Sequence, residues 1–295
     1  MLAAIVRAMR PEQWTKNLVL FAGLLFAGGL TDPVLLGLSV QGFLAFCLLS
    51  GASYLMNDLV DLRRDREHPE KRRRPLASGA VSPRAAGLAA LIAAVAGLAW
   101  SYAVNPGFGH VALGYVALNA AYSLVLRRVV ILDVMAIAVG FVLRAVGSVE
   151  VLVGDVSRIE LSPWLLVCTF LLALFLGLGK RRHEVVALGS GAGAHREALE
   201  GYPRGLVEAL ISATGSATIV SYAIYTIWPG TVEKIGSARL VYTIPFVVYG
   251  VLRYMYLILA AGQGGAPARS LVSDRPLGLN ILLWVVAVAI TIYLR

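Results

Sequence analysis

Nine apolar segments follow one another along this chain of 295 residues. A helix needs about 20 apolar residues to cross the hydrocarbon core of a bilayer. Within that core, only helices and closed barrels satisfy every backbone hydrogen bond. The predicted spans cover approximately residues 18–37, 38–57, 84–104, 109–126, 131–153, 161–180, 205–228, 239–261 and 277–294, the first two being separated only by a turn at Thr31-Asp32-Pro33. The sequence therefore predicts an all-α polytopic membrane protein with about nine transmembrane helices.

Composition agrees with this fold class. Hydrophobic residues make up 58% of the chain and charged residues 15%, and the mean hydropathy is +0.76; a soluble domain of this size is far less apolar. The net charge of +9 does not indicate a nucleic-acid partner, because the basic residues fall in short loops between apolar segments. Cys47 and Cys168 lie inside apolar segments, where we interpret them as packing residues. We expect one membrane-embedded domain over residues 1–295.

The distribution of Lys and Arg predicts the orientation in the membrane. Cytoplasmic segments of membrane proteins carry an excess of these residues. With the N-terminus inside, twenty of the 26 basic residues fall on the cytoplasmic side and four on the opposite side. Loops at about 58–84, 127–130, 180–204 and 262–276 would then cap the cytoplasmic ends of the spans. We expect a multi-pass protein of the cell (inner) membrane whose active site faces the cytoplasm.

A cluster of acidic and amide residues lies at the end of the second predicted span. Asp58, Asp61 and Asp65 stand at positions i, i+3 and i+7, so on a helix they share one face, and Asn57 lies close to the same stripe. Oxygen ligands of this kind suit Mg²⁺, which shares its coordination shell with substrate phosphates. The alternative is a solvated helix end whose acids pair with nearby arginines. We predict that Asn57, Asp58, Asp61 and Asp65 are metal ligands.

Three predicted cytoplasmic loops carry cations suited to phosphate groups. Guanidinium groups bind phosphate oxygens in pairs, and ammonium groups bind them as point charges. For any single loop, topology signalling and attraction to anionic membrane lipids explain the charge equally well. Three such loops next to one acidic face favour a polyphosphorylated ligand. The candidates are Lys71, Arg72 and Arg74 in the first loop, Lys180, Arg181 and Glu184 in the second, and Arg275 in the third.

Two arginines, Arg144 and Arg253, lie inside predicted spans. A charge at such a position is costly and usually marks a functional cavity, although snorkelling or a buried ion pair also explains it. Arg144 shares its helix face with Asp133, which suits either a ligand or a charge at a helix N-terminus. Further candidates for phosphate contacts are Lys16, Tyr122, Arg127 and Arg144.

The pattern Asn57-Asp58-x-x-Asp61-x-x-x-Asp65 resembles the first aspartate-rich motif of the UbiA-type intramembrane transferases. The resemblance implies nine transmembrane helices around a central cavity that is open to the cytoplasmic side and laterally to lipid. In most members, Mg²⁺ on two acidic motifs ionises a prenyl diphosphate. The second motif, Asp-x-x-x-Asp, is expected after the sixth span, where this chain has Lys180-Arg181-Arg182-His183-Glu184.

Further blocks resemble the decaprenyl-phosphate phosphoribosyltransferase branch of that superfamily. They are Arg10 to Asn17, Asp65 to Pro75, Gly179 to Arg181 with Glu184, and Asp274-Arg275, whereas Arg182 stands where a Tyr is more usual. This resemblance extends from residue 10 to about residue 276. It implies transfer of 5-phosphoribose from phosphoribosyl diphosphate (PRPP) to a polyprenyl (decaprenyl) phosphate, with release of pyrophosphate, for the arabinan (arabinogalactan) precursors of the cell wall.

The resemblance also implies roles for single residues. Asp58, Asp61, Lys180 and Arg181 are the expected catalytic residues, and the expected substrate-binding residues are Lys16, Asn57, Asp65, Lys71, Arg72, Arg74, Tyr122, Arg127, Arg144, Glu184 and Arg275. Two other functions stay open. One is Mg²⁺-dependent transfer of a polyprenyl group from its diphosphate to an aromatic or lipid acceptor, against which the absent second acidic motif counts. The other is a transporter or lipid-binding scaffold with an ion site. The sequence leaves the acceptor's chain length and any homo-oligomer undetermined.

Overall fold

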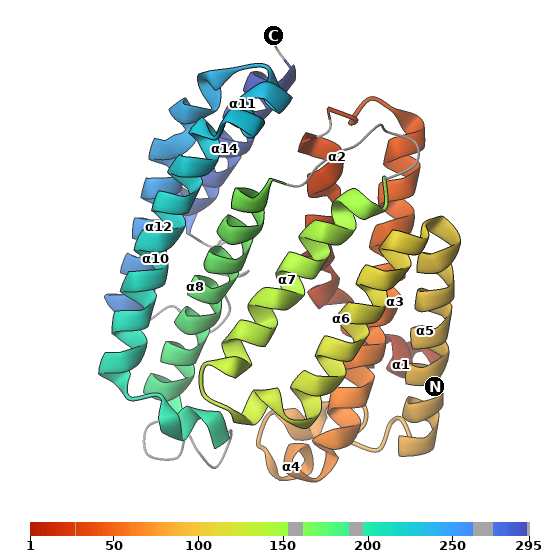
Figure 1. The fold of residues 1–295 in the computed structure, drawn as a ribbon. Helices are drawn as coiled ribbons and strands as arrows, with labels where there is room; N and C mark the ends of the chain where they lie inside the picture. The colour runs from red at the N-terminus through yellow and green to blue at the C-terminus, as the bar shows by residue number, and fades with distance from the viewer. Residues whose placement is uncertain (27, 153–161, 189–196, 262–273, 294–295) are drawn as a thin grey trace. The chain divides into compact units, whose positions relative to one another are not determined.

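The computed structural model describes residues 1–26, 28–152, 162–188, 197–261 and 274–293, and every regular element within these ranges is a helix (Figure 1). The chain forms two compact units. Unit 1 comprises Met1–Leu126 and Leu143–Ile159, and unit 2 comprises Arg127–Val142 and Glu160–Arg295. The boundary between them falls within helix α7 (Leu132–Glu150). The prediction of an all-α protein is confirmed.

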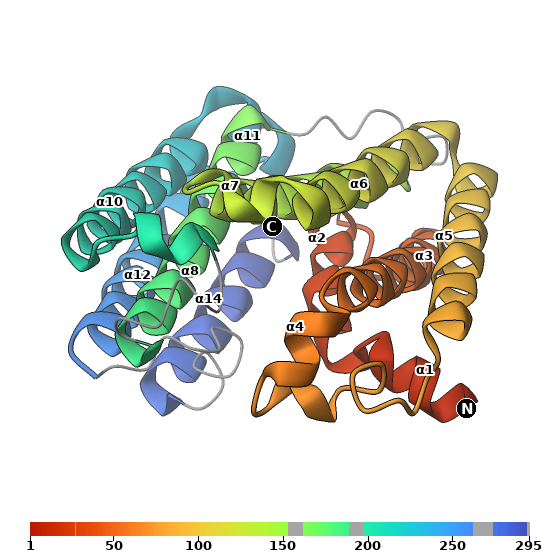
Figure 2. The ribbon, with the colours of Figure 1, turned by 90° about the horizontal axis from the view of Figure 1, so that it is seen from below.

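In unit 1, helix α3 is the central element and packs mainly on α5, and also on α6 and η1. Figure 2 looks along these helices and shows α3 beside α5. A Cβ on Gly97 of α5 would lie 2.7 Å from Cδ2 of Leu49, so this close approach of the two helices needs a glycine. The elements before α7 are α1 (Leu2–Ala8), the 3₁₀ helix η1 (Pro11–Phe21), α2 (Ala22–Phe26), α3 (Pro33–Val60), α4 (Leu62–Glu67), η2 (Lys71–Arg73), α5 (Pro83–Val104) and α6 (Pro106–Leu124).

The predicted first span, 18–37, is wrong as a continuous helix. A 3₁₀ helix and the short α2 occupy its first half, and α3 begins only at Pro33. Asp32 caps α3, because its Oδ1 accepts hydrogen bonds from the backbone N–H groups of Val34 (2.8 Å) and Leu35 (3.3 Å). The predicted turn at Thr31 to Pro33 is therefore confirmed. Apolar length alone did not reveal that the helix after this turn runs unbroken to Val60.

Unit 2 is a second group of long helices. Helix α8 packs on α10, α10 packs on α12, and α12 packs on α14. Phe175, Ile211, Val251 and Tyr254 lie in the buried core between them. After the boundary in α7, the elements are α8 (Pro163–Leu188), η5 (Glu197–Gly201), α10 (Arg204–Ile227), α11 (Pro229–Ile235), η6 (Ala238–Thr243), α12 (Ile244–Leu259) and α14 (Arg275–Tyr293); the short η3 (Leu126–Arg128) precedes α7.

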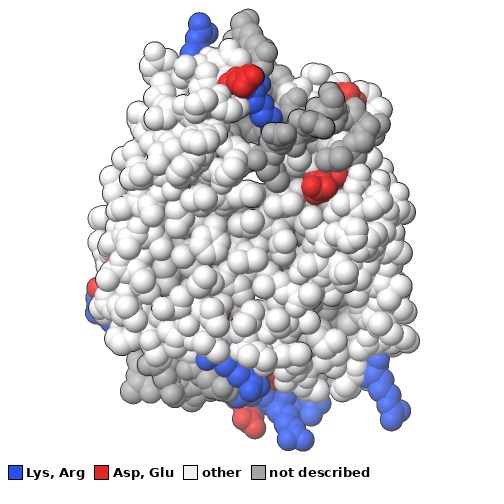
Figure 3. All heavy atoms as spheres, viewed as in Figure 1, with Lys and Arg blue, Asp and Glu red and all other residues white. Residues whose placement is uncertain are grey.

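The chain is an integral membrane protein. Within the described ranges, seven helical segments are long and apolar enough to cross a bilayer: Pro33–Val60, Pro83–Val104, Leu132–Glu150, Pro163–Ala187, Arg204–Ile227, Ala238–Leu259 and Arg275–Ile292. Figure 3 shows Lys and Arg side chains near helix ends, while the surface along the helices carries hardly any charge. Large apolar side chains such as Leu91 and Leu282 are exposed there, which is the surface that lipid covers. The count of nine spans stays a prediction.

Candidate functional site

The first charged cluster lies in unit 1 at the end of α3, where α4 follows (Figure 1). Asp61 separates the two helices with φ −91° and ψ 3°, and the N–H of Asp65 donates to the carbonyl of Asp61 (2.9 Å). The helical period is thus kept across the junction. Nη1 of Arg74 donates to Oδ1 of Asp58 (3.2 Å) and to Oδ2 of Asp65 (2.6 Å). The prediction that these two carboxylates share one face is confirmed.

A second arginine, Arg10, also donates a hydrogen bond to Asp58. Its backbone is left-handed (φ 55°, ψ 67°) and the next residue is Pro11, although the residue before a proline favours an extended conformation. Such strain costs about 1–3 kcal/mol and persists only where the surroundings impose it. The ion pair with Asp58 and the Tyr54 ring, 4.9 Å below the guanidinium carbon, supply that constraint. We call Arg10, Asp58, Asp65 and Arg74 the acidic cluster.

The cations that lie among these carboxylates are the two arginines, as in the alternative interpretation of the sequence. In the part of the chain that the structure describes, no group of three or more His, Cys, Asp or Glu side chains is placed to hold a metal ion. Asp58 is only 2% exposed, however, and its Oδ2 has no hydrogen-bond partner among the described residues. An unsatisfied buried carboxylate oxygen is costly. Together with Asn57, Asp61 and Asp65 it forms an all-oxygen donor set, which has the chemistry that Mg²⁺ prefers.

The turn that carries the predicted phosphate-binding residues is held by His68. Nδ1 of His68 accepts hydrogen bonds from the backbone N–H groups of Glu70 (3.2 Å) and Lys71 (3.3 Å), and so fixes the start of η2. Lys71 is half-buried and Arg72 is exposed. The sequence analysis did not identify His68, although its place just before Pro69, in a turn, is a position where a side chain often caps the backbone.

Arg144 lies in a buried polar network within unit 1. Its Nε donates to Oδ1 of Asn17 (2.8 Å) and its Nη2 to the hydroxyl of Tyr115 (2.7 Å). Asn17 in turn donates to Oγ of Ser50 (3.2 Å). The sequence predicted Arg144 but missed Tyr115 and Ser50, which only the need of a buried guanidinium for acceptors would have indicated. Of the other candidates in this unit, Lys16 is exposed and Tyr122 is half-buried.

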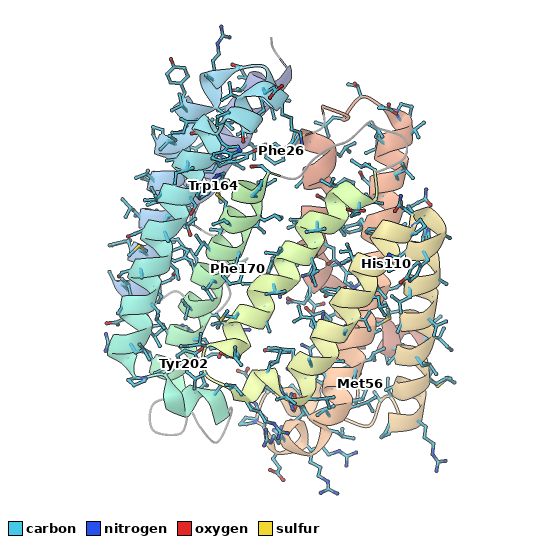
Figure 4. The ribbon with its side chains drawn as sticks, in the orientation of Figure 1. Phe26, Met56, His110, Trp164, Phe170 and Tyr202 are labelled. Atoms are coloured by element: carbon cyan, nitrogen blue, oxygen red, sulfur yellow. The ribbon has the colours of Figure 1, made fainter. Side chains whose placement is uncertain are left out.

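The second charged cluster lies in unit 2 around the buried Asp133. Oδ2 of Asp133 accepts from Nε of Arg181 (2.7 Å), and Oδ1 accepts from the hydroxyl of Tyr202 (2.6 Å). Nη1 of Arg181 donates to Oε2 of Glu184 (2.6 Å), and Nζ of Lys180 lies 3.9 Å from Oε1 of Glu184. We call Ile131, Asp133, Lys180, Arg181, Glu184 and Tyr202 the Asp133 network. Figure 4 shows Tyr202 at the end of unit 2 where α8 ends.

The residue before α7 is strained, and Tyr202 holds it. Ile131 has φ +70°, which is a rare conformation for a β-branched residue. Its N–H donates to the hydroxyl of Tyr202 (2.7 Å), while its carbonyl accepts from Met135 in the first turn of α7 (2.9 Å). Burial, and then the hydrogen bond to Asp133, raise the pKa of Tyr202, so the phenol keeps the proton that it donates. The sequence analysis missed Tyr202.

Arg181 lies deeper than its predicted role suggests. It is 1% exposed, whereas the side chains of Lys180 and Glu184 are 48% and 25% exposed. The structure therefore brings Lys180, Arg181 and Glu184 together but presents only the first and last of them to solvent. Asp133, for which two interpretations were open, is a buried partner of Arg181. Arg127 is half-buried in η3, and Arg275 is exposed at the start of α14.

Arg182 has a structural role. It donates to the carbonyls of Ile258 (2.5 Å) and Leu259 (3.2 Å) at the end of α12 and to Oε1 of Glu208 on α10 (2.9 Å). A cation is favourable at a helix C-terminus, where the last carbonyls lack helical partners. This contact accounts for an arginine at the position where the branch more usually has tyrosine.

We expect Arg182→Gln to destabilise the protein by about 2–3 kcal/mol, because hydrogen bonds to charged groups are lost from a buried site. The melting temperature in detergent would fall while KM for the donor stays unchanged. Arg204→Gln is the matched control, since Arg204 also binds Glu208 (2.9 Å) but is exposed, and exposed pairs contribute little. A raised donor KM at an unchanged melting temperature would contradict the structural role.

Arg253, the second arginine predicted inside a span, forms an ion pair. Its Nε and Nη2 lie 3.2 and 2.9 Å from the two carboxylate oxygens of Asp274. Asp274 also caps α14 by accepting from the N–H of Leu277 (2.9 Å). The hydrogen bonds from Arg253 lower the pKa of Asp274, so the carboxylate stays ionised. The buried-pair alternative is therefore the observed arrangement.

Comparisons with known proteins agree with this architecture. A family model described as the UbiA prenyltransferase family matches residues 17–294. The chain is 30% identical over 292 residues to the decaprenyl-phosphate phosphoribosyltransferase of Mycobacterium tuberculosis (strain H37Rv), covering 98% of this chain and 94% of that protein. It is also 30% identical over 299 residues to the protein of the same name from Corynebacterium glutamicum, covering 98% and 87% of the two chains.

Solved structures show the same fold. A UbiA homologue from Archaeoglobus fulgidus bound to GPP and Mg²⁺ is similar with a TM-score of 0.73 and 21% identity, over 98% of this chain and 99% of that one. The same homologue bound to DMAPP and Mg²⁺ has a TM-score of 0.74 at 20% identity, over 99% of both chains. At this level of identity, the likeness concerns the fold.

Proposed function

The chain belongs to the UbiA prenyltransferase family, and we propose that it transfers 5-phosphoribose from phosphoribosyl diphosphate to a polyprenyl phosphate, releasing pyrophosphate. The full-length relatives named decaprenyl-phosphate phosphoribosyltransferase support this choice of reaction. The observation that carries it is the charge at the end of α8. Where a second acidic motif is expected, this chain has the exposed Lys180 beside Arg181, which is already paired with two carboxylates. Such a cluster suits phosphate groups.

In this proposal the acidic cluster serves the diphosphate of the donor. Asp58 and Asp61 would hold Mg²⁺, with Asn57 and Asp65 in support, and the ion would neutralise charge on the leaving pyrophosphate. Phosphate oxygens also compete with carboxylates for guanidinium groups. Arg74, which lies between Asp58 and Asp65, would therefore bind a donor phosphate. Lys71 and Arg72, in the same turn, would bind the remaining oxygens.

The second cluster would bind the rest of the donor. Lys180 would contact a phosphate, and Glu184 would accept a hydrogen bond from a ribose hydroxyl. That Arg181 itself touches the donor stays a prediction; its contacts with Asp133 and Glu184 make it a support for Glu184. Further phosphate contacts are proposed for Lys16, Tyr122, Arg127, Arg144 and Arg275.

The proposed reaction is a displacement at C1 of the ribose. The bond from C1 to the diphosphate oxygen breaks, and pyrophosphate leaves with the electron pair. An oxygen of the lipid phosphate attacks C1 from the opposite face and forms the new bond. This oxygen is anionic at neutral pH, so no strong general base is needed. The residues contribute mainly by neutralising charge and by positioning the two substrates.

We also propose the cellular setting. The lipid tail requires a site within the membrane, and the excess of basic residues in the loops around the acidic motif favours a cytoplasmic active site with the N-terminus inside. On the same grounds, we propose nine spans in the cell (inner) membrane. The product would supply arabinan precursors of the cell wall.

A comparison of donors on one purified preparation tests the proposal. With a polyprenyl phosphate and Mg²⁺ present, we expect pyrophosphate release from PRPP, and none when the lipid, the donor or the metal is omitted. Turnover of a labelled polyprenyl diphosphate with an aromatic acceptor, without use of PRPP, would instead support prenyl transfer, the alternative that the GPP-bound neighbour favours. Lipid binding without turnover of either donor would favour a transporter or scaffold.

We expect Lys180→Gln to lower kcat/KM for PRPP roughly 30-fold, which corresponds to about 2 kcal/mol for one lost charged hydrogen bond. The side chain is half-exposed, so the melting temperature should change little. Lys234→Gln is the control, because Lys234 is an exposed lysine on α11 of the same unit and outside the proposed site. Equal activity of the two variants would remove Lys180 from the donor site.

A further inference from the structure

A buried series of hydrogen bonds in unit 2 leads from a backbone N–H to two side chains that we propose bind the donor. In order, its members are Ile131, Tyr202, Asp133, Arg181, Glu184 and Lys180. This is the Asp133 network. The reaction proposed above uses only its exposed end, so the role of the buried part remains to be explained.

The direction of each hydrogen bond in the network is determined. The N–H of Ile131 can only donate, so the hydroxyl of Tyr202 accepts it and directs its own proton to Oδ1 of Asp133. The other carboxylate oxygen is then available to Nε of Arg181. With Nε held in this way, the planar guanidinium directs Nη1 to Glu184. Each group therefore sets the orientation of the next.

The exposure of the side chains changes along the network. Tyr202, Asp133 and Arg181 are buried, while Glu184 and Lys180 are partly exposed. A donor that arrives from water reaches the last two without displacing any of the first three. The buried residues therefore suit a supporting role, and the exposed pair suits direct contact.

We propose that Asp133 and Tyr202 are positioning residues, which hold Arg181 so that Glu184 and Lys180 keep the orientation that binds the phosphorylated pentose. This inference rests on the proposed function, because it takes Glu184 and Lys180 as donor contacts. Side chains that are already ordered lose less conformational freedom on binding. The effect should therefore appear in KM for the donor and not in KM for the lipid phosphate.

Tyr202→Phe removes only the hydroxyl that joins Ile131 to Asp133. We expect kcat/KM for PRPP to fall about tenfold, mainly through KM, as for residues that orient a ligand-binding group. KM for the polyprenyl phosphate should stay the same. Tyr254→Phe is the matched control, because the hydroxyl of Tyr254 is buried in the same unit and has no hydrogen-bond partner among the described residues. It should leave both constants unchanged.

A double-mutant cycle with Glu184→Gln tests whether Tyr202 acts through Glu184. If it does, the variant with both substitutions is no worse than Glu184→Gln alone. Multiplied effects would overturn the inference, as would equal increases of both KM values or a Tyr202→Phe enzyme that behaves like Tyr254→Phe. Should Tyr202→Phe fail to fold, the same cycle with Asp133→Asn replaces it, with the same expected and contradicting outcomes.

Calorimetric binding of inorganic pyrophosphate to the same four proteins separates the two proposals. If the wild-type protein forms no product from PRPP, the proposed function fails, while a non-additive cycle in pyrophosphate binding still supports a positioning role at an anion site. If the wild-type protein turns over PRPP but the effects multiply in both measurements, the inference fails alone.

Discussion

Asp58→Asn is expected to lower kcat/KM for PRPP by about 10²- to 10³-fold, the range seen when one electrostatic contact to a developing charge is removed. The substitution preserves shape and removes the negative charge that Arg10 and Arg74 both bind. It also replaces the unpartnered Oδ2 by an amide group, depending on how the side chain turns. If Asp58 holds Mg²⁺, kcat should fall, and a higher Mg²⁺ concentration should restore little of it.

Asp32→Asn is the matched control for this variant. It makes the same chemical change at the other end of the same helix, where Asp32 caps α3. Asparagine is an equally good cap, so both activity and melting temperature should stay close to those of the wild type. If Asp58→Asn also retained wild-type activity, the acidic cluster would be a purely structural ion-pair group and the proposed metal site would be lost.

Arg181→Met is expected to have the largest effect on stability, about 3–5 kcal/mol, because it leaves the carboxylate of Asp133 buried without its cation. Tyr202 alone would then remain on that carboxylate. Unfolding in mixed micelles with increasing SDS measures the loss. Arg239→Met, at an exposed arginine of the same unit, should change the free energy of unfolding by less than about 0.5 kcal/mol.

The double variant Arg181→Met with Asp133→Asn identifies the origin of this loss. Asparagine removes the buried negative charge and still offers Tyr202 a carbonyl acceptor, so part of the lost stability should return. If the double variant were less stable than Arg181→Met alone, the unpaired charge would not be the cause.

The features that depend on neighbouring positions were predictable from the sequence. The turn at Thr31 to Pro33 and the shared face of Asp58 and Asp65 follow from proline chemistry and from helical spacing, and the structure confirms both. The membrane-protein class follows from apolar length. The first predicted span failed because η1 and α2 are as apolar as a transmembrane helix, and only the Asp32 cap shows where α3 begins.

The roles of the charged residues were less predictable. Arg181 and Arg182 adjoin each other in one basic run, yet one is held by Asp133 and the other by the end of α12. Arg253 reads as a cavity residue from its position and is found paired with Asp274. His68 and Tyr202 carry no motif at all, and they became visible only through the backbone N–H groups that they accept.

The sequence by itself determined that this protein lies in a membrane and carries an oxygen-rich acidic face followed by basic loops, because length, hydropathy and residue spacing are local properties of the chain. Tertiary structure alone decided which charged side chains are exposed for a ligand and which are spent on one another. Arg10 and Asp58 are 48 residues apart, and Asp133 and Tyr202 are 69 apart. No local pattern encodes such pairs, since burial in a common core is what brings them together.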